Sequence, residues 1–191
     1  MKITKTILIP IVISLLSINV NAAKLAECKS DDCVEYFNKF KVSAKRGHPV
    51  AMATVGQFYE LGYGTDKNET LALKYYEKSS RLDNPVAQYK AGLLYLSSEK
   101  HKDIAKGVNY LEKSAKNNFK NSIFLLGIIY LNKDFGAYDL VKADKYLAKA
   151  YDNKHQDMPT LIDYLNEKNR VQAGAFPNLV SALKTTPLAV N

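Results

Sequence analysis

Apolar residues recur at helical spacing along most of the chain, in segments that alternate with short polar turns. One such segment, AMATVGQFYELGYG, spans residues 51–64 and carries Gly56 in its middle. A glycine inside a helix costs about 1 kcal/mol relative to alanine. A cost of this size needs a structural reason, and the first indication of one is that the same pattern recurs.

The pattern around Gly56 returns twice, with a period of about 36 residues. The three copies are Ala51, Val55, Gly56 and Tyr59; Ala87, Ala91, Gly92 and Tyr95; and Ser122, Leu126, Gly127 and Tyr130. A second pattern lies between them, in LALKYYEKSS (71–80), KGVNYLEKSA (106–115) and KADKYLAKAY (142–151), which align through Tyr75, Tyr110 and Tyr146. A truncated copy, YFNKFKVSA, precedes them at 36–44. Self-similarity at this period indicates a repeat array.

Each repeat unit holds two apolar-periodic segments joined by turn-forming residues, which predicts a helix–turn–helix pair. Neighbouring pairs must stack to bury their apolar faces, and strand signals are almost absent, so the predicted fold is all-α. The glycines are expected to let the partner helix approach closely, with the following tyrosine, such as Tyr59, packing over the gap. At the start of the second helix, Asp66 or Asn68 is expected to act as the cap, with Glu69 completing a capping box after Asp66.

These residues resemble the Sel1-like repeat, a relative of the tetratricopeptide repeat. The first full unit fits best, through Ala51, Val55-Gly56, Tyr59, Gly62, Gly64, Ala72, Tyr75-Tyr76 and Lys78. The later units lack the glycine pair in SSEKHKDI (97–104) and NKDFGAYDL (132–140), which puts their inter-helix turns in doubt. The resemblance covers roughly residues 31–152 and implies a right-handed α-solenoid with a capping helix at its C-terminal end.

The resemblance also implies a style of action rather than a reaction. Sel1-like proteins look like scaffolds whose concave surface binds other proteins, and exported bacterial ones resemble envelope adaptors, host-contact factors or immunity proteins. We therefore expect a non-enzymatic scaffold that binds a protein partner, such as a secreted antibacterial toxin, and that is a monomer when free. The alternative is a structural or regulatory subunit of an envelope machine, such as a flagellar, secretion or cell-wall assembly.

The first 22 residues have the layout of a secretory signal peptide. Lys2 and Lys5 precede the apolar core ILIPIVISLL (7–16), and VNA (20–22) supplies small residues for cleavage near Ala22. An apolar core of this length is too short for a membrane span, which needs about 20 residues. The expected organisation is a signal peptide at 1–22, an N-terminal helix with a disulfide loop at 23–47, the repeat array at 48–155, and a cap helix and tail at 156–191. The expected location is the periplasm or the exterior, without stable membrane insertion.

The two cysteines, Cys28 and Cys33, lie close together in CKSDDC. In an oxidising compartment such a pair is expected to form a disulfide, which would fix the mature N-terminus at the start of the first helix. The closed loop is short, so its stabilisation should be nearer to about 2 than to about 4 kcal/mol. The spacing does not match a catalytic C-x-x-C motif, and Glu27 before Cys28 argues against a lipid anchor.

No catalytic, cofactor-binding or metal-binding motif is present in the sequence. His48, His101 and His155 lie about one repeat apart and none has a second ligand at helical spacing. Nucleophile-elbow and phosphate-loop motifs are missing, so we expect no enzyme and no cofactor. The formal net charge of +8 is spread along the chain, which favours a solvated surface over a nucleic-acid footprint and leaves a weak attraction to anionic membranes open.

The outward face of each first helix is expected to line the binding groove. The candidate residues are Gln57 and Glu60 in unit one, Tyr89, Lys90 and Leu93 in unit two, and Phe124 and Ile128 in unit three. The third of these helices (122–131) is apolar all round, so something must cover it. One covering is the chain itself, through a capping helix in 158–169 and the tail at 175–190, which would shift binding toward Gln57, Glu60 and Lys90. The other is an apolar partner anchored on Tyr89 and Phe124.

Overall fold

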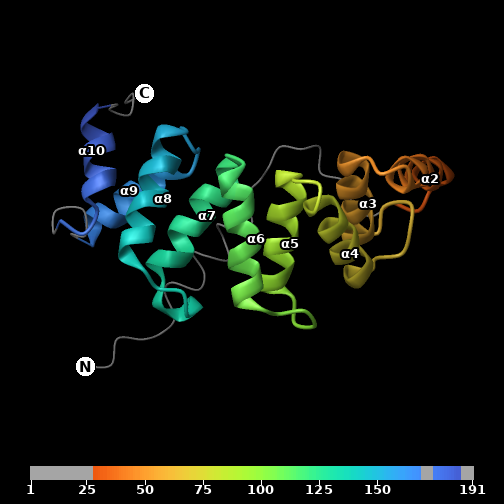
Figure 1. Ribbon diagram of the computed structural model, residues 1–191, viewed down its shortest axis with the longest axis horizontal. Helices are drawn as coiled ribbons and strands as arrows, with labels where there is room; N and C mark the ends of the chain where they lie inside the picture. The colour runs from red at the N-terminus through yellow and green to blue at the C-terminus, as the bar shows by residue number, and fades with distance from the viewer. Residues whose placement is uncertain (1–27, 169–173, 186–191) are drawn as a thin grey trace.

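The computed structural model describes residues 28–168 and 174–185, and these residues form a row of α-helices (Figure 1). Within the described residues there are nine α-helices, one 3-10 helix and no β-strand. The predicted all-α solenoid is therefore confirmed. The predicted signal peptide at 1–22 and the last part of the tail, 186–191, lie outside the described residues. None of the described helices combines the length and the apolar character that a membrane crossing requires.

Three helical hairpins make up the centre of the row. Their first helices are α3 (Pro49–Leu61), α5 (Pro85–Ser97) and α7 (Lys120–Leu131), and their second helices are α4 (Glu69–Ser80), α6 (Ile104–Lys116) and α8 (Leu140–Asp152). Before them lies α2 (Asp31–Lys45), and after them lie α9 (Met158–Glu167) and α10 (Pro177–Thr185). A short 3-10 helix, η1 (Lys133–Phe135), joins α7 to α8. From α2 to α8, each helix packs on the next one along the chain. Their buried apolar residues form two clusters, one within α2–α5 and one that extends from α5 to α10.

The glycines allow close helix packing, as the sequence predicts. A Cβ atom on Gly56 would lie 2.8 Å from the ring of Tyr76, and one on Gly127 would lie 2.5 Å from Leu147. The side chain that fills the gap therefore comes from the second helix of the same hairpin. The expectation that Tyr59 packs over Gly56 is wrong, because that ring lies further along α3 and stacks on Tyr75, with the ring centroids 5.7 Å apart. The same stack recurs between the aligned tyrosines of the other two hairpins.

The turn inside each hairpin is closed by the same backbone hydrogen bond, even where the glycine pair is missing. The N–H groups of Asn68, Asp103 and Asp139 donate to the carbonyl oxygens of Tyr59, Tyr95 and Tyr130, at 2.7, 2.8 and 2.9 Å. The same three residues cap the second helices through their side chains. The helix cap is thus Asn68 and not Asp66, so the predicted capping box is wrong. Glu69 instead accepts a hydrogen bond from Ser98 of the next hairpin.

Hydrogen bonds between consecutive hairpins also repeat. Tyr95 donates to the Glu77 carboxylate at 2.6 Å, and Tyr130 donates to Glu112 at 2.5 Å. Burial, followed by the hydrogen bond to Glu77, raises the pKa of Tyr95, so its hydroxyl stays protonated and remains a donor. Tyrosines on α5 and α7 therefore hydrogen-bond to α4 and α6, the second helices of the preceding hairpins.

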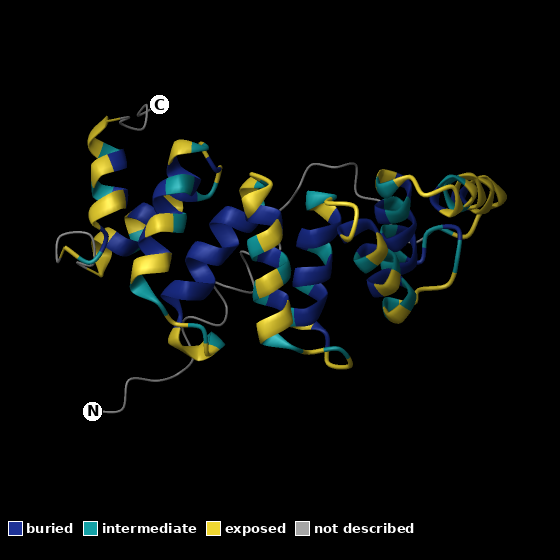
Figure 2. Cartoon of the chain, viewed as in Figure 1, coloured by how far each residue is buried: buried dark blue, intermediate teal, exposed yellow. Residues whose placement is uncertain are grey.

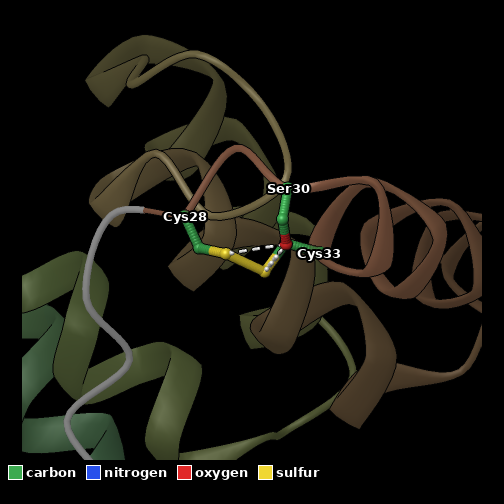
Figure 3. The surroundings of a disulfide bond; sticks show 3 residues. All are labelled: Cys28, Ser30 and Cys33. Atoms are coloured by element: carbon green, nitrogen blue, oxygen red, sulfur yellow. Dashed lines mark hydrogen bonds between the residues drawn. A yellow bond between two sulfur atoms is a disulfide. The ribbon is translucent and has the colours of Figure 1, made fainter.

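The disulfide between Cys28 and Cys33 is present, as predicted, with the Cα atoms 6.1 Å apart (Figure 3). Cys33 lies in the first turn of α2, and the carbonyl of Cys28 accepts a hydrogen bond from the N–H of Gly64 at 2.6 Å. A Cβ atom on Gly64 would lie 2.1 Å from the Cys33 carbonyl oxygen, so only glycine fits here. The loop thus fastens the start of α2 to the turn between α3 and α4.

The C-terminal segment folds back onto the last hairpin, so the predicted capping helix is confirmed in α9. Its apolar side chains, together with those of α10, belong to the same buried cluster as α7 and α8. α10 packs mainly on α8, which differs from the expectation that the tail lies in the groove. Asp144 on α8 explains this position, because its buried carboxylate accepts hydrogen bonds from the N–H groups of Asn178 and Leu179, both at 2.9 Å. The Asp144 carboxylate of α8 therefore caps the N-terminus of α10.

Candidate protein-binding groove

The outward face of the first helices becomes less exposed from α3 to α7. Ala53, Tyr89 and Phe124 occupy equivalent positions, as do Gln57, Leu93 and Ile128. Gln57 and Leu93 are half-buried, whereas Ile128 is buried. Every residue of α7 from Ser122 to Leu131 is buried, and the ribbon of this helix is dark blue in Figure 2. The predicted groove is therefore open at its N-terminal end and closed at α7.

Aromatic rings of the chain itself cover two of the predicted groove residues. Phe119 lies against Tyr89, with the ring centroids 5.2 Å apart, and His155 lies on Phe124 at 4.2 Å. Tyr89 is 8% exposed and Phe124 is 1% exposed. The face that the sequence predicts to be open at Tyr89, Phe124 and Ile128 is thus covered, because residues just before α7 and α9 fold over it. The covering is therefore internal, but its rings come from Phe119 and His155 and not from the segments 158–169 and 175–190 that the sequence predicts for it.

The open part of the groove contains a pocket between α3 and α5, with a volume of about 160 Å³. Its walls include Val50, Ala53 and Gln57 from α3, and Asn84, Val86 and Lys90 at and beyond the start of α5. We call it the α3–α5 pocket. Two of its apolar side chains are unusually accessible, since Val50 is 66% exposed and Val86 is 44% exposed. Neither valine is among the predicted groove residues, although each follows a helix-starting proline at the same place in its repeat.

Three predicted residues lie together at this pocket. Gln57 and Lys90 line it, and Lys90 reaches back to Glu60, with its Nζ atom 3.3 Å from each carboxylate oxygen. The hydroxyl of Tyr76 on α4 also donates to Glu60. Glu60 thus connects α3 to α4 and to the next hairpin, and the polar side of the pocket is fixed in place.

The electrostatics of the pocket suit binding rather than proton transfer. Burial, with a smaller contribution from Glu60, raises the pKa of Tyr76 well above its usual value. The same two causes raise the pKa of Tyr89 to about 12. Both phenols therefore stay protonated at physiological pH. Within the part of the chain that the structure describes, no group of three or more His, Cys, Asp or Glu side chains is placed to hold a metal ion.

A broader depression, of about 800 Å³, lies between α6, η1 and α8. Its lining includes Val108, Glu112, Tyr138 and Lys142. None of these residues is among the predicted groove residues, because the depression forms where NKDFGAYDL (132–140) departs from the repeat pattern. Phe135 and Tyr138, the two aromatic residues of that segment, both line the depression and are the signal that could have indicated it.

The three hairpins coincide with three matches to the family model described as Sel1 repeat, at residues 49–84, 85–119 and 121–155. A solved structure of a Sel1 repeat protein from Oxalobacter formigenes is 26% identical and superposes with a TM-score of 0.58, covering 63% of this chain and 50% of that one. The structure of c5321, a protective antigen of uropathogenic Escherichia coli strains with an SLR fold, gives a TM-score of 0.64 at 17% identity, covering 78% and 34%. The second likeness concerns the fold alone.

Two curated proteins are similar over 48% of this chain. One is chitin synthase regulatory factor 3 of Schizosaccharomyces pombe, at 26% identity, and the other is a putative sel1-like repeat-containing protein of Acanthamoeba polyphaga mimivirus, at 32%. The chain covers only 10% and 16% of the length of these relatives. The family matches span more than half of the chain. The chain therefore belongs to the Sel1 repeat family, whose members are typically non-enzymatic scaffolds that mediate protein–protein interaction.

Proposed function

We propose that this protein is a non-enzymatic scaffold that binds a protein partner on the open part of the groove, at the α3–α5 pocket. The observation that carries the proposal is the combination of this pocket with the two exposed valines beside it. Exposed apolar side chains next to a cavity mark a surface that gains from being covered. Tyr89, Phe124 and Ile128 of the predicted groove are buried within the chain itself, so we expect the partner to bind at the pocket. Gln57 and Lys90 form its polar side, and Glu60 holds Lys90 in place.

The proposed location is the periplasm or the exterior, after cleavage of a signal peptide near Ala22. The pattern of the first 22 residues supports it. The disulfide between Cys28 and Cys33 supports it as well, because cytosolic thiols are kept reduced. Within that location, we propose that the partner is a secreted antibacterial toxin and that the chain acts as its immunity protein.

The binding proposal is tested with the chain from residue 23 as bait for envelope proteins, in three versions. Wild type and Val141→Arg should capture the same protein, because Val141 is 79% exposed on α8, away from the pocket. Gln57→Arg should weaken capture by about tenfold or more, because it places a charge in the pocket wall. Capture that is equal for all three versions, or that is absent, contradicts the proposal.

The immunity role is tested by deleting the gene and growing the mutant with its toxin-secreting siblings. The mutant should be killed, and wild type but not the Gln57→Arg variant should restore survival. Unchanged survival of the mutant contradicts this role while leaving the binding proposal standing.

A second candidate is a structural or regulatory subunit of an envelope assembly. It is favoured by one observation, that a curated relative is named as a regulatory factor of chitin synthase. A subunit of a fixed machine should concentrate at defined foci in the cell, whereas a free adaptor or immunity protein should be diffuse.

We further propose that the chain is a monomer when free. Light scattering of the purified mature chain tests this proposal.

A further inference from the structure

The α3–α5 pocket occupies a space that aromatic rings fill elsewhere in the array. In the step from α5 to α7, the equivalent positions carry Tyr89 and Phe119, whose rings are in contact. In the step from α7 to α9, they carry Phe124 and His155, which stack in parallel with 7° between the ring planes. In the step from α3 to α5, the same two positions carry Ala53 and Asn84, and both line the pocket. The cavity exists because two small side chains replace a pair of rings.

The size of the cavity fits one aromatic ring. An apolar cavity of about 150 Å³ inside a protein is large enough to bind benzene, and this pocket has about 160 Å³. The side chain of Asn84 cannot close it, because its carbonyl oxygen accepts a hydrogen bond from the N–H of Ala87 at 2.9 Å. Val50 and Val86 provide exposed apolar walls beside the opening.

The charge of the pocket also suits a ring. Lys90 lines it and presents an ammonium group, held at Glu60 by 3.3 Å contacts. The chain repeatedly places lysines over tyrosine rings, with Lys106 at 5.5 Å from the Tyr95 centroid and Lys142 at 4.8 Å from that of Tyr130. A ring that enters the pocket would have the Lys90 side chain beside it, and the electron-rich face of an aromatic ring attracts a cation.

We propose that the α3–α5 pocket binds one aromatic side chain, phenylalanine or tyrosine, from the protein partner. The ring takes the place that the rings of the chain itself take in the two following steps. This inference rests on the proposed function and specifies the partner's anchoring residue. Aromatic anchors in such pockets carry a large share of binding energy in protein interfaces.

The test is a random peptide library selected on the mature chain, with Ala53→Tyr as the critical variant. This substitution places at position 53 the residue that stands at the equivalent position 89, so it should fill the pocket from within. Selected peptides should share one aromatic residue, and Ala53→Tyr should weaken their binding by about tenfold or more. The control, Val141→Tyr, adds the same ring at a remote exposed site and should change binding by less than about twofold.

A second variant and a second probe keep the test decisive even if the Ala53→Tyr variant does not fold. Val86→Tyr starts from an exposed residue on the opposite wall and should reduce binding in the same way. N-acetyl-tyrosinamide, titrated into the wild-type chain, should shift the NMR signals of the Ala53, Val50 and Val86 methyl groups more than N-acetyl-leucinamide does at the same concentration.

Selected peptides without a shared aromatic residue would overturn the inference, and so would equal binding to the Ala53→Tyr and Val141→Tyr variants. If an envelope protein binds in a Gln57-dependent way but ignores Ala53→Tyr, the aromatic anchor is wrong and the proposed function stands. If tyrosinamide binds the pocket but no envelope protein is captured, the pocket's preference stands and the proposed function fails.

Discussion

The imidazole ring of His155 lies parallel to the ring of Phe124, with 4.2 Å between their centroids. Its Nδ1 atom accepts a hydrogen bond from the N–H of Asp157 at 3.3 Å, so the neutral ring carries its proton on the buried Nε2 atom. Protonation would place a second proton on Nδ1, and that hydrogen bond would be lost. His155 therefore covers Phe124 of α7 as a neutral aromatic ring.

This arrangement predicts acid sensitivity. Burial lowers the pKa of His155 from 6.5, Lys120 lowers it further, and the Asp157 carboxylate opposes both. Because the unfolded chain binds the proton more tightly, the contribution of His155 to stability is complete above its unfolded pKa and is lost as pH falls through the folded one. His155→Phe, which imitates Phe119 in the preceding unit, should reduce the loss of unfolding free energy between about pH 7 and pH 5.

Urea unfolding across this pH range measures the effect. The matched control is His48→Phe, which changes an exposed histidine at the same place in the first repeat and should leave the slope unchanged. If the unfolding free energy of wild type and of the His155→Phe variant changes equally with pH, the protonation of His155 does not cause the acid sensitivity.

The carboxylate of Asp144 should determine whether α10 stays docked. It is 2% exposed and accepts hydrogen bonds from two backbone N–H groups and the Asn178 side chain. Asp144→Ala removes all of these acceptors and should lower the unfolding free energy by about 2–3 kcal/mol. Asp144→Asn keeps one acceptor oxygen and should cost less. A loss below about 0.5 kcal/mol for the alanine variant, as measured by urea unfolding, would contradict the role.

Gly127 should not tolerate even one added methyl group. Alanine favours a helix by about 1 kcal/mol over glycine, but its Cβ would lie 2.5 Å from Leu147. Gly127→Ala should therefore destabilise the chain by about 1–3 kcal/mol, since overcrowding a packed core has this cost. In a double-mutant cycle, Leu147→Ala should abolish the penalty of Gly127→Ala, because the clashing atoms are gone. Additive effects of the two substitutions would mean that the close approach is not what requires glycine.

The disulfide should contribute about 2 kcal/mol, because the loop it closes is short. Reduction with dithiothreitol should lower the unfolding free energy of wild type by that amount. A variant with both Cys28→Ser and Cys33→Ser should already be less stable and should not respond to the reductant. If wild type is equally stable with and without dithiothreitol, the loop does not stabilise the attachment of α2.

The features that the sequence predicted are those set within one repeat. The periodic Gly56, Gly92 and Gly127 and the register of the tyrosines follow from local pattern, and the structure confirms a close helix approach at each glycine. The features that the sequence missed depend on contacts between units. The filling of the Gly56 gap by Tyr76 is an exception within one unit, because it is decided by how α4 docks on α3.

Whether a groove residue is open depends in the same way on the next repeat. Tyr89 and Phe124 resemble free anchors when each helix is considered alone, and only Phe119 and His155 of the following units reveal that they are covered. The pocket itself could have been found from sequence by aligning these pairs with Ala53 and Asn84. That comparison requires knowing which residues of neighbouring repeats are in contact. The residue just before the first helix of one hairpin contacts the first helix of the hairpin before it, as Phe119 contacts Tyr89. The periodicity of the sequence does not reveal this contact.

Photo-crosslinking in living cells can show whether the array binds its partner at the open step between α3 and α5. A photoreactive amino acid is placed at position 57 in the pocket wall, or at position 141 on α8 as the control. We expect one discrete protein adduct from position 57 and none from position 141. No adduct from position 57, or the same adducts from both positions, would contradict binding at this step.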